Sequence, residues 1–209
     1  MRKIKRVNLF KVAKRQRGLN KRQKQDVKRL MGTRLEKKII DTVASTTASQ
    51  TGNIDSVAAI TQGTGLNNRV GDHVRPHKVE LSYGIIGADD TNYVRVTLLQ
   101  WKPDTANEAP TMAGIYEDIA TAIPYSSFNS ENLAKMRVLY DQYHCTSLNG
   151  QNCLSRKITI PASRLLKNIN FNGSATTGEN KFYLVLWSDS GAVSHPSVNY
   201  YFRLYYTDA

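Results

Sequence analysis

The chain has 209 residues and a formal net charge of +12, from 29 Lys and Arg against 17 Asp and Glu. The charge is concentrated at the beginning: residues 1–38 carry 16 − 2 = +14, whereas residues 39–209 carry 13 − 15 = −2. A near-neutral body of this length is long enough for one domain with its own core. The lack of a long apolar window predicts no membrane span, and the lack of an apolar stretch in the first 30 residues predicts no secretory signal.

The basic segment predicts a polyanionic partner. Nucleic acid carries one charge per phosphate and releases counterions when cations bind, so binding should depend on salt and largely ignore base sequence. The only aromatic residue among the first 80 is Phe10, which argues against base stacking as the main mode. A solvated basic tail and a nuclear localisation signal remain alternatives. The candidate nucleic-acid-binding residues are Arg15, Arg17, Lys21, Arg22, Lys24, Lys28 and Arg29.

An apolar stripe lies at the end of this basic arm. Val27, Leu30, Met31, Leu35 and Ile39 recur at helical spacing and predict a short amphipathic helix. Such a helix is not stable alone in water, so we expect its stripe to pack against the body or against copies of itself. The stripe has no Trp or Phe, which disfavours a membrane surface as its partner.

The composition predicts three parts in the chain. We assign residues 1–41 to the arm, residues 42–58 to a linker, and residues 59–209 to a compact domain. Residues 42–53 are small and polar, which indicates a linker or an extended segment.

Beyond the linker, the apolar pattern changes from a helical period to alternation. One internal helix is predicted, from the shared face of Met112, Ile115, Tyr116, Ile119 and Ile123. Many strands with almost no crossover helices predict an all-β antiparallel sandwich or jelly roll. The strand-like segments are residues 79–83, 93–99, 136–143, 157–160, 182–187 and 198–206.

No motif for catalysis stands out. Gly63-Thr64-Gly65 lacks the Gly-Lys-Ser/Thr of a phosphate-binding loop, and His73 and His77 have no third metal ligand nearby. His144 and His195 cannot be placed beside a particular serine or aspartate from the sequence. We expect a protein without enzymatic activity and without a small-molecule substrate.

Two cysteines, Cys145 and Cys153, flank an Asn149-Gly150 turn signal. A two-residue turn would leave them one position out of register, whereas a three-residue loop would place them opposite each other. Two cysteines do not make a disulfide framework, so we expect reduced, partly buried thiols.

Four stretches of the sequence carry a family resemblance. They are Lys28-Arg-Leu-Met-Gly-Thr-Arg-Leu-Glu-Lys-Lys38, Ile60-Thr-Gln-Gly-Thr-Gly-Leu-Asn-Asn-Arg-Val-Gly-Asp-His-Val-Arg75, Tyr206-Thr-Asp-Ala209 and, more weakly, Val138-Leu-Tyr-Asp141. In their order and spacing, they resemble the coat proteins of the satellite tobacco necrosis virus family. The Gln62-Gly63 pair followed by Arg69-x-Gly71-Asp72 also resembles coats of some small circular-DNA viruses.

The resemblance implies a single eight-stranded antiparallel jelly roll whose basic N-terminal arm ends in a short α-helix. It implies a structural protein of the virion, with sixty copies in an icosahedral shell that is assembled in the host cytoplasm or nucleus. The arms would point inward onto packaged nucleic acid, with RNA favoured over DNA, and Lys28 and Arg29 match positions that face it. The alternative is a monomeric nucleic-acid-binding β domain with a basic tail.

The resemblance also implies calcium between subunits. Glu36 and Asp208 match acidic positions that contribute there, with backbone carbonyls near Val70 and His73, and hard oxygen ligands suit calcium. A helix-surface ion pair for Glu36 and a frayed terminus for Asp208 are the alternatives. A second acidic position of the family is Thr64 in this chain, which leaves that other calcium location without its acid.

Overall fold

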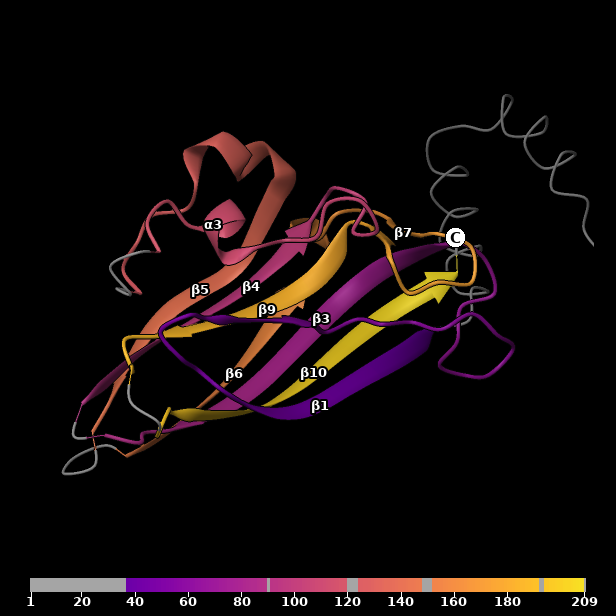
Figure 1. The fold of residues 1–209 in the computed structure, drawn as a ribbon. Coiled ribbons are helices and arrows are strands. Elements are labelled where there is room, and N and C mark those ends of the chain that lie inside the picture. Colours follow the sequence, from indigo (N-terminus) through magenta and orange to yellow (C-terminus); the bar gives the residue numbers. More distant parts are fainter. Residues whose placement is uncertain (1–36, 90, 120–123, 148–151, 192–193, 209) are drawn as a thin grey trace, which may run out of the picture. The chain divides into compact units, whose positions relative to one another are not determined.

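The computed structural model describes residues 37–89, 91–119, 124–147, 152–191 and 194–208 (Figure 1). The compact unit that they form begins at Lys37. Most of the predicted arm, including the stripe from Val27 to Leu35, therefore lies outside the described residues.

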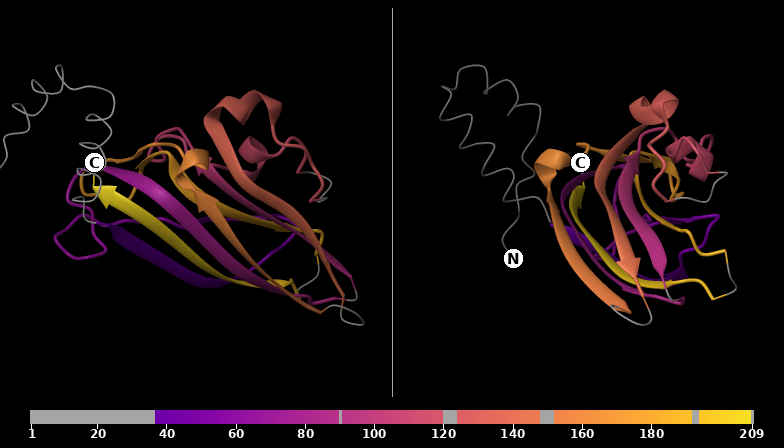
Figure 2. Two further views of the ribbon diagram at one scale, coloured as in Figure 1. Left: turned by 180° about the vertical axis from the view of Figure 1, so that it is seen from behind. Right: turned by 90° about the vertical axis from the view of Figure 1, so that its left-hand side faces the viewer.

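Two antiparallel sheets make up this unit (Figures 1 and 2). In the first sheet the order is β1-β10-β3, and both β6 and a short β7–β8 pair lie on the far side of β3. In the second sheet the order is β2-β9-β4-β5. The strands of the first sheet are β1 (Lys38–Thr47), β10 (Ser197–Asp208), β3 (His73–Ile86), β6 (Cys153–Pro161), β7 (Ile169–Phe171) and β8 (Gly178–Glu179). Those of the second are β2 (Asn53–Ser56), β9 (Lys181–Ser188), β4 (Asn92–Trp101) and β5 (Met136–Thr146).

The strand order is that of a jelly roll. Apart from the short β7 and β8, 10 − 2 = 8 strands remain, and almost every connection between consecutive ones passes from one sheet to the other. The β4–β5 connection alone joins neighbours within a sheet. The prediction of an eight-stranded antiparallel jelly roll is confirmed, and each of the six predicted strand segments lies in one of the observed strands.

The main core lies between the sheets and follows from the alternation along each strand. On β3, Val79 and Leu81 are buried, while Glu80 and Ser82 point away from the core. Strand β9 is buried on both faces because a second cluster of buried residues, which includes Val185 and Trp187, covers the outer face of its sheet. This second core explains why residues 182–187 are apolar without alternation.

The predicted internal helix is much shorter than expected. Only α3 (Met112–Ile115) forms, with the Thr111 side chain accepting a hydrogen bond at its N-terminus. The chain then becomes extended at Tyr116, which pairs with Phe128. The Tyr116 ring packs 5.0 Å from that of Trp187, so tertiary packing ends the helix at a residue that its spacing would have included. A 3₁₀ helix, η2 (Ser130–Lys135), follows it and leads into β5.

The segment predicted as a linker contributes two strands. Residues 42–47 belong to β1, which pairs with β10 from Lys38 opposite Tyr206 to Thr47 opposite Ser197, and residues 53–56 form β2. Ile39, which was expected on the helical face of the arm, is also in β1, so the helix prediction is wrong at its end. The ladder of hydrogen bonds to β10 fixes an extended backbone there, and small polar side chains suit an edge strand with one exposed face.

Both cysteines are exposed free thiols, so the expectation of partly buried thiols is wrong. Cys145 pairs with Tyr93 of β4, whereas Cys153 pairs with Ile86 of β3. The β5–β6 connection therefore crosses between the sheets, and neither predicted hairpin register applies.

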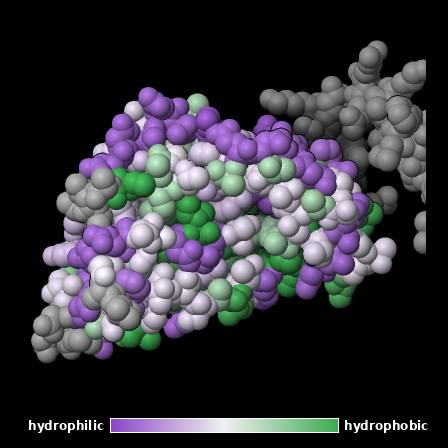
Figure 3. All heavy atoms as spheres, viewed as in Figure 1, coloured by the Kyte–Doolittle hydropathy of each residue, from purple (hydrophilic) through white to green (hydrophobic). Residues whose placement is uncertain are grey.

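The surface in view is mixed (Figure 3). Hydrophobic residues there form small groups separated by hydrophilic ones, as is normal for a domain surface. No helix in the described part of the chain is both long and apolar enough to cross a membrane.

Gly178 should be required where β8 meets β7. Its φ is +147°, and a Cβ atom there would lie 2.0 Å from the carbonyl oxygen of Asn170. We expect Gly178→Ala to destabilise the chain by about 2 kcal/mol or more, because strain and a backbone clash add. Gly71→Ala is the control, since a Cβ at Gly71 meets nothing within 4 Å. Equal urea-unfolding midpoints for the two variants would contradict this account.

Candidate functional site

A closed loop joins β2 to β3 and contains the longest of the resemblance motifs. The backbone N–H of Gly63 donates to the carbonyl of Arg69 at 2.9 Å, and the N–H of Arg69 donates to Thr61 at 3.0 Å. The Gly63 amide is therefore occupied within the loop and is not available to a phosphate. We call residues 61–72 the Arg69 loop.

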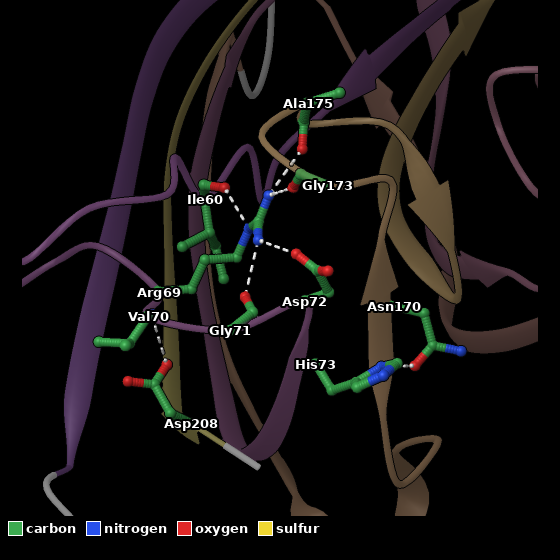
Figure 4. A network of polar contacts seen from close by, with 10 residues as sticks. All are labelled: Ile60, Arg69, Val70, Gly71, Asp72, His73, Asn170, Gly173, Ala175 and Asp208. Carbon is green, nitrogen blue, oxygen red and sulfur yellow. Dashed lines mark hydrogen bonds and ion pairs between the residues drawn. The ribbon is translucent and has the colours of Figure 1, made fainter.

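The guanidinium of Arg69 is the centre of this loop (Figure 4). It is fully buried, and its three nitrogens donate five hydrogen bonds to three separate parts of the chain. Its partners are the carbonyl oxygens of Ile60 (3.3 Å), Gly71 (2.7 Å), Gly173 and Ala175 (2.9 Å), and the carboxylate of Asp72 (3.2 Å). A buried cation is tolerated when its donors are satisfied in this way.

A second buried cation lies beside the first. The ammonium of Lys181 is 3.6 Å from the ring centre of Phe171, and the guanidinium of Arg69 is 4.3 Å from the same ring. Lys181 donates one hydrogen bond, to the carbonyl of Ala58 at 3.2 Å. Burial, and then the nearby charge of Arg69, lower the pKa of Lys181 to about 7.

The first and last strands meet next to the Arg69 loop. The ammonium of Lys38, which is almost fully buried, lies 2.8 Å from the carboxylate of Asp208 and donates to the carbonyl of Asn68 at 2.7 Å. The same carboxylate accepts a hydrogen bond from the Val70 amide at 3.4 Å. Lys38, the second of the described residues, therefore joins the start of β1 to the end of β10.

Of the predicted site residues, only Asp208 is in the described part of the chain. It is an ordered ion-pair partner, so the alternative of a frayed terminus is wrong for this residue. The other predicted residues, namely Arg15, Arg17, Lys21, Arg22, Lys24, Lys28, Arg29 and Glu36, lie outside the described residues.

The calcium prediction does not fit the described residues of one chain. Asp208 is the one predicted carboxylate among them, and Lys38 already neutralises it at 2.8 Å. No group of three or more His, Cys, Asp or Glu side chains in the described ranges could hold a metal ion. Because Glu36 lies outside those ranges, calcium between subunits stays a prediction, and we derive no part of the function from it.

The histidines have structural partners. Ser190 lies between Asp89 (3.4 Å) and His195 (3.3 Å), whereas a hydrolytic triad needs the histidine between the acid and the serine. Burial lowers the pKa of His144, which favours its neutral form beside Tyr83. The other ring hydrogen bonds join His73 to Asn170 (2.9 Å), His77 to Thr207 (3.0 Å) and His144 to Tyr83 (2.7 Å).

The sequence reasoning missed the roles of Arg69, Lys181 and Lys38. Arg69 stands in the Arg69-x-Gly71-Asp72 motif, and its setting among glycines could have suggested a side chain bonded to backbone carbonyls. Lys181 directly precedes an apolar strand, which is a weak sign of burial. The partners of Lys38 come from loops distant in sequence, so no local pattern reveals them.

Replacing Arg69 should destabilise the chain strongly. In Arg69→Lys the smaller ammonium cannot reach all five acceptors, so buried carbonyls lose their donors and we expect a loss of at least about 3 kcal/mol. Asp72→Asn is the control: its side chain is 48% exposed, and the change should cost no more than about 1 kcal/mol. Urea unfolding of the two variants measures the difference, and similar values would contradict the central role of Arg69.

Lys181 should make stability depend on pH. Its pKa is about 7 in the folded chain and near 10.5 when unfolded, so the unfolded state binds this proton more tightly. Stability is therefore lost as the pH falls from about 10.5 to about 7 and levels off below that. We expect Lys181→Met to gain stability relative to the wild type as the pH falls through this window.

The measurement is the free energy of unfolding between pH 6 and 10. Lys157→Met, at an exposed position of β6, is the matched control and should run parallel to the wild type. A constant difference between Lys181→Met and the wild type across this range would show that Lys181 stays charged in the folded chain.

The chain was compared with known protein families, sequences and structures. The family model described as satellite tobacco necrosis virus coat protein matches residues 11–209. No curated protein sequence matches the chain significantly. Among solved structures, a chain of Desmodium yellow mottle tymovirus is 10% identical with a TM-score of 0.35, and the match covers 81% of this chain and 87% of that one.

Two further solved structures are similar to the same degree. A chain from the empty head of turnip yellow mosaic virus is 9% identical with a TM-score of 0.39, covering 82% of this chain and 79% of that one. A chain of sacbrood virus of honeybee in expansion state I is 11% identical with a TM-score of 0.33, covering 84% and 88%. At these TM-scores the three structural similarities support no conclusion about this chain. The family match, in contrast, spans nearly the whole sequence. The chain belongs to the satellite tobacco necrosis virus coat protein family and is a structural, non-enzymatic protein of a virus particle.

Proposed function

We propose that sixty copies of this coat protein close into an icosahedral shell and that the basic arms hold the packaged nucleic acid inside it. The division of charge is the observation that carries this proposal. With the boundary at Lys37, residues 1–36 carry 14 − 2 = +12, and residues 37–209 carry 15 − 15 = 0.

This division suits the two tasks of a coat protein. Neutral bodies pack side by side with little mutual repulsion, whereas the arms attract a polyanion. Sixty arms would bring 60 × 12 = 720 positive charges to the packaged strand. The seven candidate residues from Arg15 to Arg29 contribute more than half of each arm's net charge.

The contacts of Lys38 support a fixed attachment point for the arm. Because its ammonium is bonded to Asp208 and to the Asn68 carbonyl, the backbone that follows the arm is tied to the sheet. A cationic chain tied at one end stays at a high local concentration near any strand bound by its neighbours. Packing into a shell then converts many weak phosphate contacts into strong retention.

RNA is the genome that we favour, with DNA as the alternative. The resemblance to satellite virus coats supports RNA, while an arm that contacts phosphates does not distinguish the two sugars. Assembly would take place inside the host cell, and the protein would then reside in the virion.

The test replaces the seven candidate arm residues, Arg15, Arg17, Lys21, Arg22, Lys24, Lys28 and Arg29, by glutamine. The arm then carries 12 − 7 = +5, and we expect the nucleic acid per particle to fall to roughly half. The ratio of absorbance at 260 and 280 nm of purified particles measures it. The matched control carries Lys21→Arg, Lys24→Arg and Lys28→Arg, which keep the charge and should keep the content.

A second measurement covers the case in which the glutamine variant forms no particles. Filter binding of the unassembled chain to single-stranded RNA should then show weaker binding and a smaller dependence on salt than in the control. An unchanged nucleic acid content, or an unchanged salt dependence, would contradict packaging by the arm.

A further inference from the structure

A basic pocket of about 750 Å³ lies at one end of the sandwich and has no part in the functions discussed above. It is formed between β3, β5, the 3₁₀ helix η3 (Ala162–Arg164) and the segment that leads into β7. Its polar lining consists of three cationic side chains, three asparagines and a serine, and no Asp or Glu lines it. The cations are Arg75, Arg137 and Lys167, and the asparagines are Asn168, Asn170 and Asn180.

The three cations of the pocket are unpaired. Within the described ranges, the side chains of Arg75, Arg137 and Lys167 make no hydrogen bond and no ion pair. Other arginines of the body are neutralised: Arg95 lies 2.8 Å from Asp141, and Arg203 lies 2.7 Å from Asp41. Three like charges that line one cavity without a countercharge repel one another, so an anion bound in the cavity would be stabilised.

Hydrogen bonds from the buried Gln100 side chain hold the wall of the pocket in place. The buried side chain of Gln100 accepts a hydrogen bond from the Leu166 amide at 2.8 Å and donates to the Asn180 carbonyl at 3.3 Å. The Asn180 side chain donates in turn to the Asn168 carbonyl at 2.9 Å. Asn180 has a φ of 58°, the one positive φ of a non-glycine residue in the described ranges. A braced wall can hold charged groups in position before a ligand arrives.

We propose that this pocket binds a phosphate group. Arginine and lysine bind phosphate oxygens through charge-assisted hydrogen bonds. The carboxamide of Asn168 supplies a further donor, whereas those of Asn170 and Asn180 already donate to Glu179 (2.6 Å) and to the Asn168 carbonyl (2.9 Å). The pocket has the volume of a small-ligand site, but no aromatic ring lines it, so bases would not stack there. The phosphate belongs either to the backbone of a nucleic acid strand or to a free nucleotide or polyphosphate.

This binding site is on the body and does not depend on the arm. It would therefore persist if the proposal of packaging by the arm failed. If its ligand is a nucleic acid strand, the body contributes a contact of its own to the packaged genome.

Chemical protection of single lysines in the full-length chain tests this proposal. Lys167 and Lys157 are both exposed, but only Lys167 lines the pocket, so Lys157 is an internal control. Both are acetylated under limiting reagent, with and without inorganic tripolyphosphate, and the modification is read by mass spectrometry. We expect tripolyphosphate to protect Lys167 and to leave Lys157 unprotected.

Arg137→Gln should weaken this protection, so that about tenfold more tripolyphosphate is needed, since one charge-assisted contact is lost. Arg156→Gln, at an exposed position of β6 outside the pocket, removes the same charge and should leave the protection unchanged. Unfolding curves of both variants confirm that they fold.

Repeating the experiment with a short oligouridylate distinguishes the two sources of phosphate. Protection of Lys167 by both ligands supports a strand of nucleic acid, and protection by tripolyphosphate alone supports a free phosphate compound. Equal protection of Lys167 and Lys157, or protection that Arg137→Gln leaves unchanged, would contradict the proposal that this pocket binds phosphate.

Discussion

The buried guanidinium of Arg69 is the interaction on which this end of the molecule depends. The Arg69 side chain bonds at once to Ile60 in the segment after β2, to Gly71 just before β3 and to Ala175 in the loop after β7. A planar group with five donors can satisfy carbonyls from several directions, which lysine cannot. These loops are irregular, so the carbonyls that Arg69 contacts have no partners in a sheet. The guanidinium supplies the hydrogen-bond donors that a neighbouring strand would otherwise provide.

This arrangement also holds the start of the compact unit in place. The Arg69 loop presents the Asn68 carbonyl to Lys38 and the Val70 amide to Asp208, so the loop, the first strand and the last strand are joined by direct bonds. The division of charge therefore coincides with the start of the compact unit at Lys37. Residues 1–36 carry the net charge, and in the neutral unit that begins at Lys37 the charge of Lys38 is neutralised by its ion pair with Asp208.

The fold could be predicted well from the sequence wherever one face of a strand is buried and the other is exposed. Strands such as β3 and β10 alternate over most of their length, and both were predicted. Strand β1 was missed because most of its residues from Thr42 to Thr47 are small and polar, so the face that packs Ile40 and Ala44 on the core gives only a weak apolar signal. Pairing with β10, a strand distant in sequence, holds it extended. The helix from Met112 was predicted too long because helical spacing does not reveal that Tyr116 packs on Trp187.

The candidate site was harder to predict than the fold. Asp208 was identified through a family resemblance, but its partner Lys38 looked like one more cation of the arm. The pocket cations Arg75, Arg137 and Lys167 come from three separate segments, and only the folding of the sandwich brings them together. Local patterns cannot reveal groups that converge from distant parts of the chain.

The central claim is that a neutral jelly roll with a cationic arm builds a shell around nucleic acid. Sedimentation velocity of the full-length protein, recorded at 260 and 280 nm, tests it most directly. Sixty chains of 23.5 kDa give 60 × 23.5 = 1,410 kDa before nucleic acid is added, so the account predicts one megadalton species that absorbs strongly at 260 nm. A single species near 23.5 kDa in the presence of nucleic acid would contradict it.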